Sequence, residues 1–474
     1  MVEITVNDLV RATGARLVCG DGGRVCRGCV IDSRKAGEGS IFVAFPGQNV
    51  DGNSFAPAAV RAGAGCAVLT CEPGADLVEL ALGAGCALCV TDDPTEFLLA
   101  LAAWYRSTLP AKVVGITGSI GKTTTKDVLT AVLRTRFRVH ATQGNHNNLI
   151  GLPLTILSAP ADTEVLVLEM GMNHPGEIRR LSRCARPDYA IITKVGTSHI
   201  GLLGSRENIA RAKAEIVLGM PEGGVLALGG EDDFTPFIAR NFAEPKGIEV
   251  LLCGTSEADA VRATDVRVGD DGCPSFELSL EGEPALPCRL SLTGAQSVPN
   301  AVFAAAVAHR LGVSGGEVRE AFGSLSITGR RQEVRRARSG ARVIDDSYNA
   351  SPESMAAGLD LLAQLPCDGS RIAILGEMGE LGDEAPRLHG LVGAYAAAKK
   401  PAMLVCVGGE NAVQMASAAR LMGVDEGDIQ VFPSTEVLIE HCSDLLGAGD
   451  LALVKGSRFV GLDRYVEEVC SDVR

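Results

Sequence analysis

The chain has 474 residues, a formal net charge of −14 and only 4% aromatic residues. Its length predicts more than one domain, each with a core of its own. The acidic balance argues against nucleic acid as the main partner, because proteins that bind nucleic acid usually carry a basic surplus.

We place the first domain at residues 1–108. It begins with MVEITVNDLV, which has no apolar signal core, continues through short strand patterns such as SIFVAF, and ends in the helical pattern LLALAAWYRSTLP. No apolar stretch in the chain reaches the ~18–20 residues that a membrane helix needs. We therefore expect no membrane span and a cytoplasmic protein.

The fifteen cysteines lie mostly in apolar segments. Two C-x-x-C pairs, Cys26/Cys29 and Cys86/Cys89, have the spacing of a four-thiolate zinc site. The second pair, however, stands in GAGCALCVTDD, which is typical of a buried strand. We favour reduced, buried cysteines over structural zinc.

Residues 109–327 have the alternating pattern of a second, central domain. Apolar strand patterns recur with helical stretches between them, which predicts a mostly parallel sheet covered on both faces. Three alternating segments follow and predict a small antiparallel extension. The apolar patterns are VVGIT, EVLVLEM, YAIITKV, GGVLAL and IEVLLC, and the alternating ones are AVRATDVRV, SFELSL and PCRLSL.

Residues 328–474 form a third, Rossmann-like unit in which strand and helix patterns alternate. Its strands are predicted at ARVIDD, RIAIL, MLVCVG and LALVKG, and its helices begin near residues 353, 384, 411, 435 and 459. The basic run at residues 330–338 is interpreted as a solvated strand or linker edge. The fold class is therefore α/β with three domains.

A glycine loop joins the first central strand to a helix in VVGITGSIGKTTTKDVL, residues 113–129. Backbone N–H groups at a helix N-terminus favour phosphate oxygens, Lys122 adds a positive charge, and the Thr123 hydroxyl is suited to Mg²⁺. The usual P-loop would have its first glycine at residue 116, which is Ile. The loop predicts nucleotide binding but does not identify a reaction.

Other polar candidates follow predicted strands or lie on a helix. Glu169 and His199 come at or after strand ends, where α/β sheets place ligands. A lone strand-end carboxylate and an ordinary loop histidine are the alternatives. Lys213 lies on a helical pattern, and its spacing alone favours a solvated lysine. The segment GNHNNLIGLP holds Asn145, Asn147 and Asn148, which either line a site or form a turn.

The motifs together resemble the Mur ligase family. The loop G-x-T-G-S-x-G-K-T-T-T lacks the first P-loop glycine in the same way, and the similarity extends over essentially the whole chain. DDSYNASPESM is the most discriminating segment and resembles the branch of the family that adds D-alanyl-D-alanine. The other matching segments are IDSRKAGEGSIFVAF, LEMGMNHPGEI, GTSHIGLLGSRENIARAKAEI, GRRQEV, LGEMGELGDEAPRLH and LVKGSR.

The resemblance implies an enzyme that uses ATP to form an amide bond. Its substrates would be UDP-N-acetylmuramoyl-tripeptide and D-alanyl-D-alanine, its intermediate an acyl phosphate, and its cofactor Mg²⁺, with two ions expected. It also implies a monomer with an N-terminal uridine-nucleotide domain, a central ATPase-like domain and a C-terminal domain.

The resemblance assigns roles by position. Catalytic roles fall to Lys122, Lys213 and His199, and Lys213 occupies the position of a carbamylated lysine. ATP contacts fall to Thr117, Gly118, Ser119, Gly121, Lys122, Thr123, Thr124, Asn300, Arg330 and Asp346. Metal ligands would be Thr123, Glu169, His199 and Lys213. Substrate contacts would be Ser33, Arg34, Gly52, Asn53, Asn145, Asn147, Asn148, Tyr348 and Asn349.

Three alternatives stay open at this point. One is another Mur-type ligase that adds diaminopimelate or lysine, which DDSYNASPESM opposes. Another is a P-loop ATPase that forms no amide, and a third is an inactive homologue that only binds ligands. One departure concerns the site: many family members have an acidic residue two positions after the histidine, where this chain has Gly201.

Overall fold

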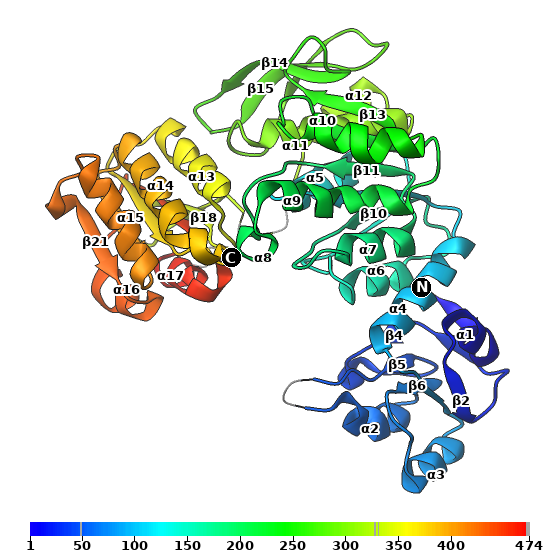
Figure 1. Cartoon of the computed structure of the whole chain (residues 1–474). Helices are drawn as coiled ribbons and strands as arrows, with labels where there is room; N and C mark the ends of the chain where they lie inside the picture. Colours follow the sequence, from blue (N-terminus) through cyan, green and yellow to red (C-terminus); the bar gives the residue numbers. More distant parts are fainter. Residues whose placement is uncertain (48–49, 327–328, 330, 471–474) are drawn as a thin grey trace.

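The computed structural model describes residues 1–47, 50–326, 329 and 331–470. In this part of the chain the strands form sheets of two, five, nine and six strands. Figure 1 shows the N-terminal domain in blue, the C-terminal domain in yellow to red, and the central domain between them. The expected three-domain α/β fold is confirmed. No helix in the described ranges is long and apolar enough to cross a membrane.

The N-terminal domain contains a sheet of order β2-β7-β6-β5-β4, which is parallel except for the pairing of β2 with β7. Strands β1 and β3 pair separately in an antiparallel ribbon. The strands are β1 (Glu3–Thr5), β2 (Arg16–Cys19), β3 (Val25–Arg27), β4 (Cys29–Val30), β5 (Ile41–Val43), β6 (Cys66–Leu69) and β7 (Ala87–Val90). The helices are α1 (Val6–Thr13), α2 (Ala56–Arg61), α3 (Ala75–Gly83) and α4 (Pro94–Thr108).

The cysteines of this domain are free, and both Cys86 and Cys89 are buried, as the strand interpretation requires. Burial raises the pKa of Cys86 to about 12 and that of Cys26 to about 11. Both thiols therefore stay protonated and unreactive at neutral pH.

The central domain is a nine-stranded sheet of order β16-β15-β14-β13-β12-β11-β8-β10-β9. Strands β8 to β13 pair in parallel, as expected. The three alternating segments form the expected antiparallel extension β14-β15-β16, although β14 itself joins β13 in parallel. The strands are β8 (Lys112–Thr117), β9 (Val139–Ala141), β10 (Val165–Glu169), β11 (Tyr189–Ile192), β12 (Val225–Gly229), β13 (Glu249–Gly254), β14 (Val261–Val268), β15 (Pro274–Ser279) and β16 (Leu286–Arg289). The helices are α5 (Lys122–Leu133), α6 (Gly151–Ser158), α7 (Glu177–Ala185), α8 (Ile200–Leu203), α9 (Arg206–Ala214), α10 (Thr235–Ile238), α11 (Ser297–Arg310) and α12 (Gly315–Phe322).

The C-terminal domain has a six-stranded sheet of order β17-β18-β22-β19-β20-β21, parallel except for β17. Its strands are β17 (Glu333–Arg336), β18 (Arg342–Asp346), β19 (Arg371–Gly376), β20 (Met403–Val407), β21 (Ile429–Phe432) and β22 (Leu451–Lys455). Its helices are α13 (Pro352–Gln364), α14 (Ala385–Ala398), α15 (Glu410–Leu421), α16 (Thr435–Cys442) and α17 (Leu462–Val469). The last helix starts three residues later than expected, because a 3-10 turn precedes it at Arg458–Val460.

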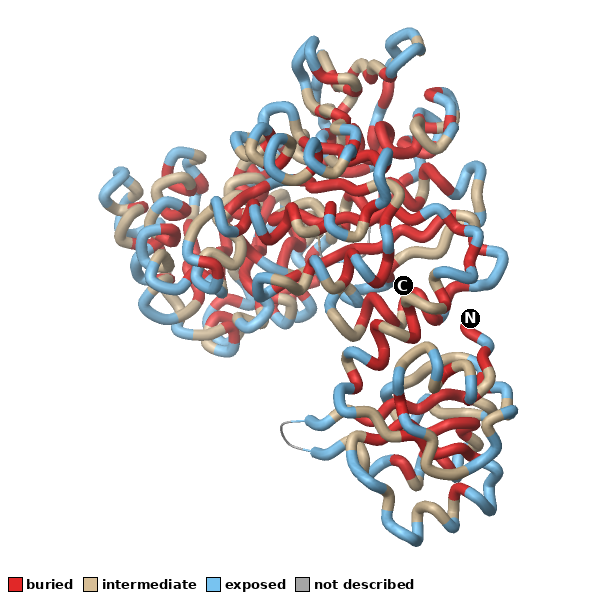
Figure 2. The backbone as a smooth tube through the Cα atoms, turned by 45° about the vertical axis from the view of Figure 1, so that its right-hand side comes forward, coloured by how far each residue is buried: buried red, intermediate tan, exposed pale blue. Residues whose placement is uncertain are grey.

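The cores explain how the domains are joined. Figure 2 shows that buried residues run through the interior of each domain, whereas exposed residues lie mostly at its periphery. Leu101 of α4 belongs to the same buried cluster as Leu157 and Leu181 of the central domain, and the Tyr105 hydroxyl donates to Ala159 O at 2.8 Å. Helix α4, which ends the predicted first domain, therefore anchors that domain to the central one. The boundaries at residues 108 and 327 stay predictions.

Candidate active site

The glycine loop between β8 and α5 is closely packed against its surroundings. Gly118 has φ +151°, and a Cβ there would lie 1.9 Å from Thr193 Oγ1. Gly121 has φ +82°, and a Cβ there would lie 2.3 Å from Asn300 Oδ1. Any side chain at either position would both strain the backbone and collide. This explains why the two glycines are needed at these two positions.

Lys122 begins α5 and folds back over the loop, where its Nζ donates to Gly118 O at 2.7 Å. Burial lowers its pKa, and the nearby Arg331 lowers it further, whereas Glu169 opposes the shift. A cation that is destabilised by desolvation and by a second cation gains most when an anion binds beside it. The loop is therefore electrostatically prepared for phosphate.

Thr123, which follows the glycine loop, is in direct contact with Glu169. The Thr123 hydroxyl donates to Glu169 Oε2 at 2.8 Å, and Asn147 Nδ2 donates to Glu169 Oε1 at 2.9 Å. Both Thr123 and Glu169 are only 2% exposed. β10 delivers Glu169 at its carboxyl end, adjacent to the end of β8, as the sequence predicted.

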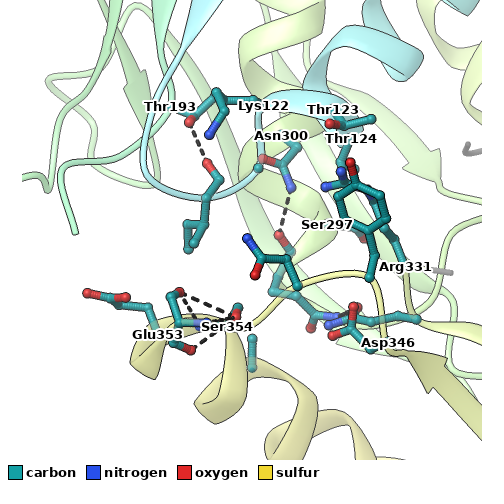
Figure 3. Close-up of a pocket in the computed structure, with 18 of the residues that line it drawn as sticks. Lys122, Thr123, Thr124, Thr193, Ser297, Asn300, Arg331, Asp346, Glu353 and Ser354 are labelled. Carbon is teal, nitrogen blue, oxygen red and sulfur yellow. Dashed lines mark hydrogen bonds between the residues drawn. The ribbon is translucent and has the colours of Figure 1, made fainter. Parts of the chain in front are cut away.

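A cavity of about 1080 Å³ separates the loop from the C-terminal domain. In Figure 3 the labelled residues come from both sides: Lys122, Thr123, Thr124, Thr193, Ser297 and Asn300 from the central domain, and Arg331, Asp346, Glu353 and Ser354 from the C-terminal one. Of the predicted residues, those that line this cavity are Ser119, Gly121, Lys122, Thr123, Thr124, Asn145, Asn147, Glu169, His199, Asn300, Asp346, Tyr348 and Asn349.

On the C-terminal side, Asp346 is held by Lys455, whose Nζ lies 2.8 Å from Asp346 Oδ2. Burial raises the pKa of Asp346, although Lys455 opposes this rise. The same Nζ donates to Asn349 O at 2.9 Å and so fixes the loop that follows β18. Arg331 stacks over the Tyr348 ring with its guanidinium carbon 4.5 Å from the ring centroid.

Arg330, the predicted ATP contact, lies outside the described residues. The neighbouring Arg331 does line the cavity, and it influences both Lys122 and Asp346 electrostatically. Sequence reasoning selected one arginine of the pair in GRRQEV and missed the other. No local sequence signal distinguishes two adjacent arginines, because both have the same charge and hydrogen-bond donors.

His199 reaches the cavity from the loop after β11 and has a positive φ of 66°. Its Nδ1 lies 2.5 Å from Glu380 Oε2 of the C-terminal domain, although the N–H is not aligned as in an ideal hydrogen bond. This contact lowers the pKa of Glu380. At Gly201 an added Cβ would lie 2.3 Å from Gly382 N, so an acidic side chain could not be accommodated in this arrangement.

Lys213 is 2% exposed, so the solvated lysine that its spacing favoured is wrong. Burial lowers the pKa of Lys213 well below its usual value, and the charge of Lys122 lowers it further. The lysine is thus close enough to the loop for Lys122 to affect it, and its neutral form is favoured.

Three other predicted residues, Asn300, Asn148 and Thr117, lie in different surroundings. Asn300 Oδ1 accepts from Thr125 Oγ1 at 3.1 Å and supports the glycine loop. Asn148 Oδ1 accepts from Gly151 N at 2.8 Å at the start of α6 and does not line the cavity. Thr117 is fully buried, and within the described chain its hydroxyl has no hydrogen-bond partner.

The predicted uridine-nucleotide residues lie on the N-terminal domain, away from this cavity. Arg34 is exposed and pairs with Asp32 at 2.8 Å. Asn53 Nδ2 donates to Thr70 Oγ1 at 2.7 Å, which ties its turn to the end of β6. Gly52 lies close to Phe45, where a Cβ would be 2.3 Å from Phe45 O. Ser33 begins the adjacent 3-10 turn.

The donor atoms near Glu169 suit a hard cation. Among the described residues no group of three or more His, Cys, Asp or Glu side chains forms a ready metal site. Mg²⁺ usually binds one or two protein oxygens and completes its shell with water and substrate phosphates. The Thr123 hydroxyl and the Glu169 carboxylate provide that kind of donor set, so the residues present fit Mg²⁺ beside a bound nucleotide.

Comparisons with known proteins agree with this geometry. Residues 26–105 match the model "Mur ligase family, catalytic domain", residues 116–308 the "Mur ligase middle domain", and residues 329–458 the "Mur ligase, glutamate ligase domain". A Bacillus subtilis protein named UDP-N-acetylmuramoyl-tripeptide–D-alanyl-D-alanine ligase is 36% identical over 94% of this chain and 93% of its own length. The chain belongs to the Mur ligase family.

Other relatives of this Mur ligase carry the same name. The Escherichia coli K12 protein is 30% identical and covers 98% of both chains. Among solved structures, MurF from Acinetobacter baumannii has a TM-score of 0.87 with 29% identity over 99% of both chains. MurF ligase from Thermotoga maritima in complex with ADP has a TM-score of 0.79 with 27% identity, over 93% of this chain and 96% of that one.

Replacing Glu169 with glutamine is expected to raise the Mg²⁺ concentration for half-maximal activity and to lower kcat by about 10²–10³-fold, because one charged oxygen next to Thr123 is lost. Titration of activity with Mg²⁺ measures both. Glu164→Gln is the matched control, since Glu164 precedes the same strand and pairs instead with Arg138. An unchanged Mg²⁺ dependence in Glu169→Gln would remove Glu169 from the metal site.

Proposed function

We propose that this Mur ligase joins D-alanyl-D-alanine to UDP-N-acetylmuramoyl-tripeptide, with cleavage of ATP to ADP and phosphate through phosphoryl transfer to the tripeptide carboxylate. The observation that carries the proposal is the cavity between Lys122 and Asp346, which brings a phosphate-binding loop opposite the strand end of a separate domain. An amide ligase must bring a carboxylate, a triphosphate and an amine together in one water-poor space. The names of the relatives supply the substrates.

ATP would lie with its phosphates on the loop from Gly118 to Thr124. Lys122 and Arg331 would neutralise phosphate charge from opposite domains. Asp346 would accept from the ribose, and Asn300 would contribute near the adenosine. We assign the arginine role to Arg331 because it lines the cavity, and keep Arg330 as a second candidate.

Mg²⁺ would be held by Thr123 and Glu169, and a second ion by His199. When bound, the metal neutralises charge on the phosphates and on the attacking carboxylate. Lys213 would act as a carbamate. Its amine is buried and its pKa is lowered, which favours the neutral form that reacts with CO₂. The carbamate is an anion, so it would balance cations that an ammonium would repel.

The reaction would then proceed in two steps. An oxygen of the tripeptide carboxylate attacks the γ-phosphorus, the bond to the β–γ bridging oxygen breaks, and ADP leaves. The amine of D-alanyl-D-alanine attacks the acyl carbon, phosphate leaves with the original carboxylate oxygen, and the amine proton passes to solvent. Lys122 and the loop N–H groups stabilise the charge that builds on the transferred phosphoryl group.

The remaining assignments concern substrates. Tyr348 and Asn349 would contact the dipeptide, and Tyr348 also lines a smaller cavity of about 320 Å³ together with Arg331 and Arg458. Asn145 and Asn147, which line the main cavity, would face the tripeptide side, and Asn148 would support them by holding the start of α6. On the N-terminal domain Ser33, Arg34, Gly52 and Asn53 would contact the UDP portion, and the exposed Arg34 offers a cation to the diphosphate.

The division at residues 108 and 327, a monomeric state and a cytoplasmic location are part of the same proposal. The separate five-, nine- and six-stranded sheets, one in each domain, support the division. Fifteen free cysteines fit a reducing compartment.

Phosphate release from ATP with Mg²⁺, the UDP-linked tripeptide and D-alanyl-D-alanine, each omitted in turn, tests the proposal. We expect release only in the complete mixture, together with a UDP-linked pentapeptide in the mass spectrum. Release that does not require D-alanyl-D-alanine would contradict the proposal and favour an ATPase or a ligase for another amino acid.

A further inference from the structure

Two short segments join the central and C-terminal domains at the edge of the cavity. Residues 199–201 follow β11, and residues 380–382 follow β19; together they are called the clasp. Gly201 N donates to Glu380 O at 3.0 Å. Ile200 packs against the main buried clusters of both domains. The clasp is thus a direct link between the two halves of the site.

Two glycines allow this approach. A Cβ on Gly201 would lie 2.3 Å from Gly382 N, and a Cβ on Gly382 would lie 2.8 Å from Gly201 Cα. Contacts this short mean that any side chain would separate the two backbones. The clasp therefore depends on glycine on both sides.

The loop that carries His199 is also fixed at a second point. Glu353 Oε1, from the first turn of α13 in the C-terminal domain, accepts from Thr197 N at 2.7 Å and from Thr197 Oγ1 at 2.9 Å. The C-terminal domain thereby holds the loop both before and after His199.

Within the clasp, Glu380 contacts His199. Oε2 of the carboxylate lies 2.5 Å from Nδ1 of the imidazole, which is ion-pair distance without the alignment of a hydrogen bond. Both residues have positive φ angles, +66° for His199 and +61° for Glu380, which residues other than glycine adopt uncommonly. The two side chains are thus brought together by backbone conformations that the surrounding structure imposes.

We infer that Glu380 is a positioning residue for His199: it engages Nδ1 and leaves the Nε2 lone pair for the cavity only while the two domains are docked. The inference rests on the proposed function, in which His199 lies near the reacting carboxylate. A neutral imidazole that carries its proton on Nδ1 has its lone pair on Nε2, and a carboxylate partner stabilises that tautomer. Docking of the C-terminal domain would then complete the central site.

The test compares Glu380→Gln with Glu384→Gln in the full-length protein. Glu384 lies in the adjacent 3-10 turn but pairs with Arg387 on the surface. ¹⁵N NMR of labelled histidines reports the tautomer of His199, and the His199→Gln variant assigns its signals. Kinetics with ATP, Mg²⁺ and both peptide substrates report kcat and KM.

We expect the Nδ1–H tautomer of His199 in the wild-type protein and in Glu384→Gln, and a loss of that bias in Glu380→Gln. The same variant should lose about 10–100-fold in kcat, with the KM for ATP unchanged. Losses of this size are typical when a carboxylate that contacts a metal-binding histidine is replaced. An unaltered tautomer in Glu380→Gln, or an altered tautomer with unchanged kcat, would overturn the inference. If the wild-type protein forms no amide, the proposed function fails, whereas the NMR comparison still decides whether Glu380 sets the state of His199.

Discussion

Replacement of Lys122 with methionine is expected to lower kcat for amide formation by about 10²–10³-fold, because one cation opposite the transferring phosphoryl group is removed. The fold should survive. Burial lowers the pKa of Lys122, which means that the folded environment disfavours its charge, so an apolar side chain of similar length relieves that cost. Steady-state kinetics and thermal unfolding of the same sample measure the two effects.

Lys112→Met is the matched control for this experiment. Lys112 begins the strand that leads into the loop, but its side chain is 60% exposed and pairs with Asp188. We expect nearly wild-type kinetics from it. Equal losses in the two variants would show that the defect is not specific to the phosphate site, and full activity in Lys122→Met would remove Lys122 from the mechanism.

Activity is also expected to depend on dissolved CO₂ through Lys213. A carbamate forms only from a neutral amine, and burial lowers the pKa of Lys213 well below 10.5, so this amine can react at a pH where an exposed lysine cannot. As the pH falls through the lowered pKa, the amine takes up a proton and the carbamate is lost. Removal of CO₂ should therefore reduce kcat, bicarbonate should restore it, and Lys213→Met should lose about 10²–10³-fold.

The pH dependence of stability distinguishes a loss of activity in Lys213→Met from a loss of the fold. Between the lowered folded pKa and the unfolded pKa, Lys213 is protonated in the unfolded chain but neutral in the folded one. The free energy of unfolding therefore decreases as the pH falls through this range. Lys213→Met removes that cost and should unfold at a temperature no lower than the wild-type protein does.

Carbamate formation can be observed directly by ¹³C NMR with labelled bicarbonate. Lys126 is the matched control, because it is also 2% exposed but its amine is engaged by Thr142 O and Asp127. The carbamate signal should disappear in Lys213→Met and persist in Lys126→Met. Activity that is insensitive to CO₂, with no carbamate signal, would contradict a modified Lys213.

The local parts of the site could be predicted from the sequence. The glycine loop, the strand end at Glu169 and the alternation of strands with helices all follow from short patterns, because backbone geometry fixes them within a few residues. The antiparallel extension after β13 could also be predicted, because its side chains alternate between apolar and polar.

Features that depend on contacts between distant segments could not be predicted in this way. The burial of Lys213 depends on elements around α9, so its own helical spacing gave the wrong environment. The contact of His199 with Glu380 crosses a domain interface, and neither local pattern indicates it. Arg331 was missed because a choice between adjacent arginines requires the path of the chain after residue 329.

The most direct test of the central claim follows an oxygen atom. The reacting carboxylate of the UDP-linked tripeptide would be labelled with ¹⁸O, and the phosphate released in the presence of ATP, Mg²⁺ and D-alanyl-D-alanine would be analysed by mass spectrometry. Attack of the carboxylate on the γ-phosphorus predicts one ¹⁸O in each phosphate released. Unlabelled phosphate would show that water attacks ATP instead, and the cavity between Lys122 and Asp346 would then belong to an ATPase and not to an amide ligase.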